Sequence, residues 1–215
     1  MKVSNRISRY MLFEDEIPTI FEENGKKGIK MGNGERIVPS IYDSIKELNM
    51  PTLQYSVELE GKFGVLEIDF NGNITTKLGI DYDLFQYLKY GEYYLVRKNS
   101  KYGIWHNDLC LPCEYDEINY IEYELKKKFC ELEYTSCENY MLLRQGDKYG
   151  LWSKETQLLP TIYDEIVPPT DEWGIKVKKG GVWGYFDKGL NFTTDLSKVP
   201  LEWENLNNVG DVITF

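Results

Sequence analysis

Short apolar segments alternate with polar turns along most of the chain. Residues 93–96 (Tyr-Tyr-Leu-Val) and 140–143 (Tyr-Met-Leu-Leu) have the aromatic, aliphatic and β-branched composition of strands. Each is followed by a turn, at 99–101 (Asn-Ser-Lys) and 145–148 (Gln-Gly-Asp-Lys), whose Asn or Gly tolerates the positive φ of a tight hairpin. The pattern predicts antiparallel strands joined by hairpins.

The chain also contains an internal duplication. Residues 101–105 (Lys-Tyr-Gly-Ile-Trp) and 111–118 (Leu-Pro-Cys-Glu-Tyr-Asp-Glu-Ile) recur as 148–152 (Lys-Tyr-Gly-Leu-Trp) and 159–166 (Leu-Pro-Thr-Ile-Tyr-Asp-Glu-Ile). Weaker copies lie on both sides, so five pivotal glycines mark five units, separated by 36, 39, 47 and 34 residues: Gly28, Gly64, Gly103, Gly150 and Gly184. A period of this length predicts stacked copies of one small β unit.

Five units of three or four short strands predict an all-β fold in one domain, residues 1–215. The repeat cores are expected at about 20–48, 55–88, 92–121, 138–168 and 173–206. A small β-propeller-like ring is the first expectation, and an open array of β repeats is the alternative. A ring would need both termini to share one sheet, and the apolar segments 10–13 and 209–215 are suited to that role.

The recurring residues are interpreted as parts of the scaffold. Each glycine is expected where a side chain would block the neighbouring backbone or an aromatic ring, and each proline at a sheet edge. The Asp of each Tyr-Asp pair can fold its carboxylate onto turn amides, whereas a catalytic carboxylate pair would appear once. These pairs are Tyr42 and Asp43, Tyr82 and Asp83, Tyr115 and Asp116, and Tyr163 and Asp164.

A turn with Gly and Lys, an aromatic-Gly step, an aliphatic-Pro step and Tyr-Asp-x-Ile together resemble the WG-repeat (KWG-repeat) family over roughly residues 25–206. Only Trp183-Gly184 carries the literal dipeptide in register, and the other units have Lys27, Phe63, Tyr102 or Tyr149 before the glycine. The second unit lacks the proline. The resemblance implies a bacterial β-repeat module with no enzymatic activity attached to the repeat.

The longest gap between glycines holds a different pattern. Ile118, Ile121, Leu125, Phe129 and Leu132 are spaced by three, four, four and three residues, which predicts a short amphipathic helix inserted at about 118–133. Alternating β character at 119–123 competes with this interpretation. Insertions in repeat scaffolds often carry specificity, so the segment 118–137 contributes candidate partner-binding residues: Tyr120, Glu122, Tyr123 and Glu124.

Trp105 and Trp152 complete the candidate partner-binding set. They occupy the same slot in two repeats, and strand alternation places Ile104 on the face opposite Trp105, so one of these two residues is expected to be the more exposed. Exposed tryptophans would favour a groove for a glycan or a peptide, and buried ones would indicate packing. Packing is the favoured interpretation.

The cysteines and the single histidine offer little chemistry. Cys110 and Cys113 form a CxxC, but Leu111-Pro112 between them matches the aliphatic-Pro step of other units. Six residues separate Cys130 from Cys137, too many for a second zinc knuckle. His106 lies at an expected strand end, without the Gly-x-Ser-x-Gly context of an activated serine. We therefore predict no catalytic residue, no metal site and no cofactor.

Charge narrows the classes of partner. The 215 residues include 25 Lys and Arg against 35 Asp and Glu, a formal net charge of −10. Nucleic acid and anionic membranes are disfavoured, because both require a basic face, and basic partners are favoured. The polar N-terminal residues do not resemble a signal peptide, and no apolar run approaches the roughly 20 residues of a membrane helix, so a cytoplasmic location is expected.

These observations predict a non-enzymatic protein-interaction scaffold, one that masks a basic partner such as a bacterial toxin in an immunity-type role. A glycan- or peptidoglycan-binding module using surface aromatics is the first alternative. A hydrolase with a carboxylate pair in a propeller channel is the second. The sequence does not predict the oligomeric state.

Overall fold

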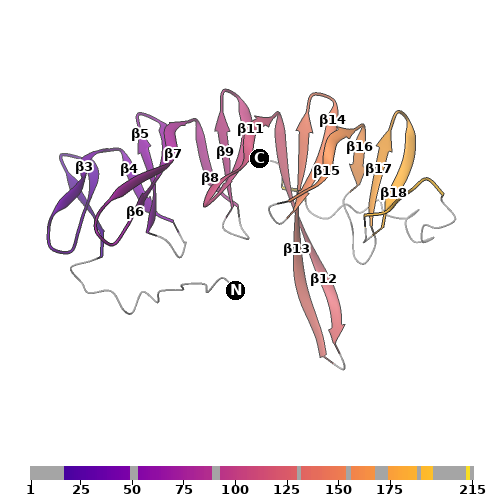
Figure 1. Ribbon diagram of the computed structural model, residues 1–215, viewed down its shortest axis with the longest axis horizontal. Coiled ribbons are helices and arrows are strands. Elements are labelled where there is room, and N and C mark those ends of the chain that lie inside the picture. The colour runs from indigo at the N-terminus through magenta and orange to yellow at the C-terminus, as the bar shows by residue number, and fades with distance from the viewer. Residues whose placement is uncertain are drawn as a thin grey trace. The chain divides into compact units, whose positions relative to one another are not determined.

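The computed structural model describes residues 17–48, 53–88, 93–129, 132–153, 156–167, 174–187, 190–195 and 212–213. These residues form an all-β fold of five small antiparallel sheets (Figure 1). The chain divides into two compact units, Met1–Cys113 and Glu114–Phe215, and each is described by itself. In the part of the chain just given, no helix has the length and apolar character needed to cross a bilayer.

The first unit contains three sheets, each formed by strands consecutive in sequence. The first sheet comprises β1 (Thr19–Glu23), β2 (Lys26–Lys30) and β3 (Arg36–Tyr42). The second comprises β4 (Ser44–Glu47), β5 (Gln54–Leu59), β6 (Lys62–Ile68) and β7 (Ile74–Tyr82). The third comprises β8 (Leu84–Tyr87), β9 (Tyr94–Lys98), β10 (Lys101–His106) and β11 (Asp108–Tyr115).

The second unit contains the fourth and fifth sheets. The fourth has the order β15-β14-β13-β12-β20, formed by β12 (Glu117–Phe129), β13 (Leu132–Gln145), β14 (Lys148–Ser153), β15 (Thr156–Tyr163) and β20 (Val212–Ile213). The fifth has the order β16-β17-β18-β19, formed by β16 (Glu165–Val167), β17 (Ile175–Lys179), β18 (Val182–Phe186) and β19 (Phe192–Thr193).

The helix predicted at 118–133 is wrong. Strands β12 and β13 pair without interruption from Glu117–Arg144 to Phe129–Leu132, and this hairpin extends well beyond the other strands of its sheet (Figure 1). A helix would have had to begin inside β12, whose first residues already pair with β13. Continuing the hairpin adds ladder hydrogen bonds with each residue pair, so the β alternation at 119–123 outweighs the helical spacing.

The expected closing strand near the C-terminus pairs elsewhere. Val212 and Ile213 of β20 lie against Ile121 and Tyr120 of β12, so this segment belongs to the fourth sheet. Its predicted partner, residues 10–13, lies outside the described residues. The aliphatic-Pro step of the fifth repeat, near residue 200, also lies outside them.

The hairpin turns have the predicted backbone. Four two-residue turns have positive φ at both positions, the geometry of a type I′ turn. They are Asn24-Gly25 (53° and 77°), Glu60-Gly61 (52° and 74°), Asn99-Ser100 (53° and 63°) and Gly180-Gly181 (58° and 80°). The prediction of tight hairpins is confirmed at these turns.

The pivotal glycines allow close approach of the third strand of each repeat. A Cβ on Gly28 would lie 2.5 Å from the carbonyl oxygen of Val38, and one on Gly103 would lie 2.5 Å from that of Leu111. On Gly184 it would lie 2.4 Å from the Phe192 ring. The prediction that a side chain here would block backbone or a ring is confirmed.

The prolines lie in edge strands, as predicted. Pro39 is exposed in β3, the last strand of its sheet, where the register with β2 shifts between Lys27 and Ile29. In the second repeat Gly79 occupies the proline slot, and β7 nevertheless forms. The missing proline therefore does not remove the third strand of that repeat.

Apolar side chains between neighbouring sheets of one unit form the core. Tyr42 of β3 packs with Tyr55 and Leu66 of the second sheet, and Tyr82 of β7 packs with Tyr94 and Trp105 of the third. In the second unit, Tyr163 of β15 packs with Ile175 and Val177 of the fifth sheet. The tyrosines of three Tyr-Asp pairs, Tyr42, Tyr82 and Tyr163, thus belong to core clusters.

Candidate functional site

The Tyr-Asp steps at Asp43, Asp83 and Asp164 carry the chain from one sheet to the next within a unit, and each of these aspartates contacts both sheets. The Asp43 N–H donates to the Glu58 carbonyl at 2.8 Å, and its Oδ2 accepts from the Glu60 N–H in the β5–β6 turn at 2.8 Å. Its Oδ1 lies 2.5 Å from Lys26 Nζ, at the start of β2 in the preceding sheet. One carboxylate therefore joins the preceding sheet to a turn of the following one.

The same contacts recur along the chain. The Asp116 Oδ2 accepts from the Gly146 N–H at 2.7 Å, and the Asp164 Oδ2 accepts from the Gly181 N–H at 3.3 Å. Lys62 pairs with Asp83, and Lys148 Nζ lies 2.6 Å from Asp164 Oδ1. Turn capping is thus confirmed at Asp43, Asp116 and Asp164.

Sequence reasoning missed the lysine of this pair. The signal was present, because a lysine precedes the pivotal glycine by two residues in four of the five repeats: Lys26, Lys62, Lys101 and Lys148. The hydrogen bond from lysine lowers the pKa of Asp43, Asp83 and Asp164 below the ordinary value. A general acid requires a raised pKa, so these carboxylates are suited to accept hydrogen bonds and not to deliver protons at neutral pH.

The aromatic residues predicted to face a partner are buried. Trp105, Trp152 and Tyr120 are 0%, 3% and 2% exposed, so none of them forms part of the surface. The expectation that Ile104 or Trp105 would be the more exposed of the two is also wrong, because both are fully buried. Trp105 packs against the Phe85 and Tyr94 rings with centroids 5.6 Å apart in each case, which supports the packing interpretation.

The other three candidates lie on the β12–β13 hairpin. Glu122, Tyr123 and Glu124 are register partners of Asn139, Glu138 and Cys137, beyond the last pairing of β13 with β14 at Met141. Their side chains lie outside the described part of the structure. Their role in binding stays a prediction.

Cys110, Cys113 and His106 occupy ordinary positions. Cys110 Sγ lies 3.5 Å from the His106 carbonyl oxygen, and Cys113 Sγ lies 3.9 Å from that of Val96. His106 ends β10 as predicted, with its ring centroid 4.7 Å from that of Tyr93. Burial raises the pKa of the Cys113 thiol, which opposes formation of a reactive thiolate.

A pocket of about 230 Å³ lies between the second and third sheets of the first unit. Ser44 and Lys46 of β4 are register partners of Glu58 and Ser56 of β5, and these four residues line one wall. The other wall is formed by Phe85 and Tyr87 of β8 and Tyr94 of β9. Sequence reasoning did not find this site, because stacking of two sheets brings its walls together.

The aromatic wall is well packed. The Phe85 and Tyr94 rings stack with centroids 4.5 Å apart, and the Tyr87 and Tyr94 centroids are 5.4 Å apart. Tyr94 is 6% exposed and Tyr87 is 50% exposed, so the wall runs from the core to the surface. Such rings offer a preorganised face to an apolar or cationic group.

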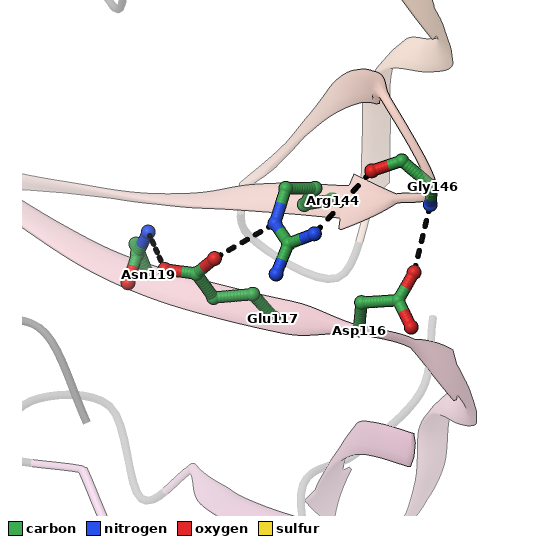
Figure 2. A network of polar contacts seen from close by, with 5 residues as sticks. All are labelled: Asp116, Glu117, Asn119, Arg144 and Gly146. Atoms are coloured by element: carbon green, nitrogen blue, oxygen red, sulfur yellow. Dashed lines mark hydrogen bonds and ion pairs between the residues drawn. The ribbon is translucent and has the colours of Figure 1, made fainter. Parts of the chain in front are cut away.

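The fourth sheet places a polar network at the positions that correspond to the polar wall (Figure 2). Glu117 Oε2 accepts from Arg144 Nε at 2.8 Å, and Glu117 Oε1 accepts from Asn119 Nδ2 at 2.9 Å. Arg144 also donates to the Gly146 carbonyl at 3.3 Å. The hydrogen bond from Arg144 lowers the pKa of Glu117 and raises that of the guanidinium. These charged groups satisfy one another within the sheet.

The acidic excess is unevenly distributed. Residues 114–215 carry 19 Asp and Glu against 11 Lys and Arg, whereas residues 1–113 carry 16 against 14. The lysine–aspartate pairs of the repeat are neutral as pairs, so the excess comes from positions outside that repeated contact.

No protein-family model matches this chain, and no curated protein matches it either.

Proposed function

We propose that this protein is a non-enzymatic interaction scaffold that binds a basic protein. The specific hypothesis to test first is that the partner is a bacterial toxin, which the scaffold masks. The observation that carries the proposal is the net charge of −10 on a scaffold whose repeated lysines and aspartates pair with each other. Charges that the repeat does not use remain available to attract and orient a basic partner. The cytoplasmic location stays a prediction.

The resemblance to WG repeats supports the same proposal. The pivotal glycine, the preceding lysine and the Tyr-Asp pair all have contacts that build and join sheets, as Gly28, Lys26 and Asp43 illustrate. These recurring residues are occupied by the scaffold itself. Specificity is therefore assigned to residues that do not recur, including those of the pocket and the β12–β13 hairpin.

For the arrangement of the five sheets we propose the open array in preference to the ring. Pairing of β20 with β12 supports this choice, because it occupies in the fourth sheet the segment expected to close a ring. Small-angle X-ray scattering tests it: an elongated particle supports the array, and a compact disc contradicts it.

The interaction is tested by affinity capture from the host lysate at low and high salt, with identification by mass spectrometry. One basic protein that is retained at low salt and released as the salt concentration rises would support the proposal, because screening weakens exposed charge pairs. A variant bait with Glu22 and Glu114 replaced by Gln should capture less of that protein. Absence of any enriched basic protein at either salt would contradict the proposal.

A further inference from the structure

One strand position changes the sign of its charge from sheet to sheet. The residue whose carbonyl accepts the N–H of the Tyr-Asp aspartate is structurally equivalent in four sheets: Glu58, Arg97, Arg144 and Lys178. Three of these residues are basic, and only that of the second sheet is acidic. Since the backbone contact is the same in all four sheets, the change in the sign of the charge reflects a difference in the surroundings of the side chain.

In the second unit this position has a partner within its own sheet. Arg144 Nε lies 2.8 Å from Oε2 of Glu117, its register partner on β12. Lys178 Nζ lies 4.0 Å from Oε2 of Glu165, its register partner on β16. Each basic residue thus meets an acid on the neighbouring strand. In the fourth and fifth sheets, the positive charge at this position is therefore neutralised by an acidic side chain of the same sheet.

In the second sheet the position has no such partner. The register partner of Glu58 is Ser44, and among the described residues no cation lies within ion-pair distance of the Glu58 carboxylate. Lys46, two residues from Ser44 on the same face, does not pair with it. Glu58 instead lines the pocket, together with aromatic residues of the third sheet.

We propose that this pocket, lined by Glu58, Phe85, Tyr87 and Tyr94, binds an arginine side chain of a basic partner protein. The guanidinium would lie beside Glu58, over Ser44, and would form the ion pair of Arg144 with Glu117 in the fourth sheet with the two charges exchanged. Its planar face stacks on aromatic rings, and its N–H groups can donate in pairs to a carboxylate. The volume of about 230 Å³ is below that of most small-ligand sites and suits one long side chain.

Lys46 and Glu47 refine this assignment. Glu47 also contributes to the lining of the pocket. Lys46, on the β4 edge of the wall, is placed to meet a carbonyl or carboxylate of the partner's backbone or side chain. This inference rests on the proposed function, because it names the group of the basic partner that is recognised.

The experiment uses the full chain and titration calorimetry with an acetylated, amidated tetra-arginine peptide at near-physiological salt. Glu58→Gln and Tyr87→Ala are each expected to weaken binding roughly tenfold, the effect of losing a charge-assisted hydrogen bond or a cation–π contact. The control Glu35→Gln removes the same charge from an exposed turn outside the pocket and should weaken binding less than about twofold. Tetra-lysine should bind more weakly than tetra-arginine.

Equal effects of Glu58→Gln and Glu35→Gln would overturn the assignment, and so would binding of methyl N-acetylglucosaminide in place of the peptide. Should Tyr87→Ala disturb the fold, Tyr87→Leu tests the same wall. The two proposals can fail separately. Capture of a basic protein equally by the wild type and by Glu58→Gln overturns the pocket alone, whereas Glu58-dependent peptide binding without a captured protein overturns the scaffold function alone.

Discussion

The fourth and second sheets carry side chains of opposite charge at the same strand position. In the fourth, Arg144 on β13 donates to Glu117 on β12, and Asn119 completes the network. In the second, Glu58 on β5 lies opposite Ser44 on β4 and lines a pocket with an aromatic wall. The same backbone geometry is therefore compatible with a charged residue paired within its sheet and with a charged residue that lines a pocket.

The difference also shows which residues belong to the scaffold. Asp43 and Asp116 make the same backbone contacts in both sheets, through the turn amides of Glu60 and Gly146. Capping of the turn by the aspartate is thus independent of whether the neighbouring polar position is paired within its sheet. Variation at one half-buried strand position can change binding without changing the scaffold.

The largest expected effect tests this common frame. Gly64→Ala should destabilise the protein by about 2–4 kcal/mol, because the new Cβ would lie 2.8 Å from the Leu78 carbonyl oxygen and 2.8 Å from Ile80. Gly79→Ala is the matched control, since its Cβ would meet nothing closer than 3.5 Å. Thermal and urea unfolding measure both. Equal stability of the two variants would refute the close-approach role.

Transplanting the fourth-sheet pair into the second sheet comes next. The double variant Ser44→Glu/Glu58→Arg should close the pocket with an internal ion pair and lower tetra-arginine affinity at least roughly tenfold. Stability should rise by no more than about 1 kcal/mol, since the pair is partly exposed. Calorimetry and unfolding measure the two effects. Unchanged peptide binding would show that the two sheets do not differ as described.

Acid should weaken the ion pair of the fourth sheet. The pKa of Glu117 is lowered in the folded protein by its hydrogen bond from Arg144. The unfolded chain therefore binds more protons in this range, and the stability contributed by Glu117 is present above about pH 4.3 and lost as the pH falls through the lowered value. Glu117→Gln should flatten the dependence of Tm on pH between about 3 and 5 by roughly 2 °C. An unchanged pH dependence in Glu117→Gln would contradict a stabilising role for the hydrogen bond from Arg144.

The smallest effect concerns the turns that cap the aspartates. Glu60 has a φ of 52° where the fourth sheet has Gly146 at 62°. Glu60→Asn should stabilise the protein by about 0.5 kcal/mol, because Asn tolerates this left-handed backbone better. Gly146→Asn at the matching position should change stability by less than about 0.5 kcal/mol. Precise urea unfolding is the measurement, and a loss of stability in Glu60→Asn would argue against strain at Glu60.

Much of the β scaffold could be read from local chemistry. The positive φ at Asn24-Gly25, the close approach at Gly103 and the capping carboxylate of Asp43 each follow from what one residue type can do. The lysine partner could have been found from its fixed distance to the glycine. Such features are local, or repeat at a fixed spacing, and so they leave a pattern along the chain.

The β12–β13 hairpin and the pocket did not follow from such patterns. The spacing of Ile118, Ile121 and Leu125 fits a helix, yet these residues continue a strand because the partner strand is already in register at Arg144. One of Ile104 and Trp105 was expected to be the more exposed, and the stacking of sheets buried both side chains. In both cases a partner distant in sequence decided the outcome.

The sequence by itself determined the net acidic charge and the set of small antiparallel sheets. The sheets could be predicted because strand periodicity, turn residues and repeated motifs depend on residues close together in the chain. Only the tertiary structure decided which faces are buried, that residues 118–129 form a strand, and that Glu58 lines the same pocket as Phe85, Tyr87 and Tyr94. The physical reason is that burial and pockets arise where separate sheets pack, and that packing brings together residues far apart in the chain.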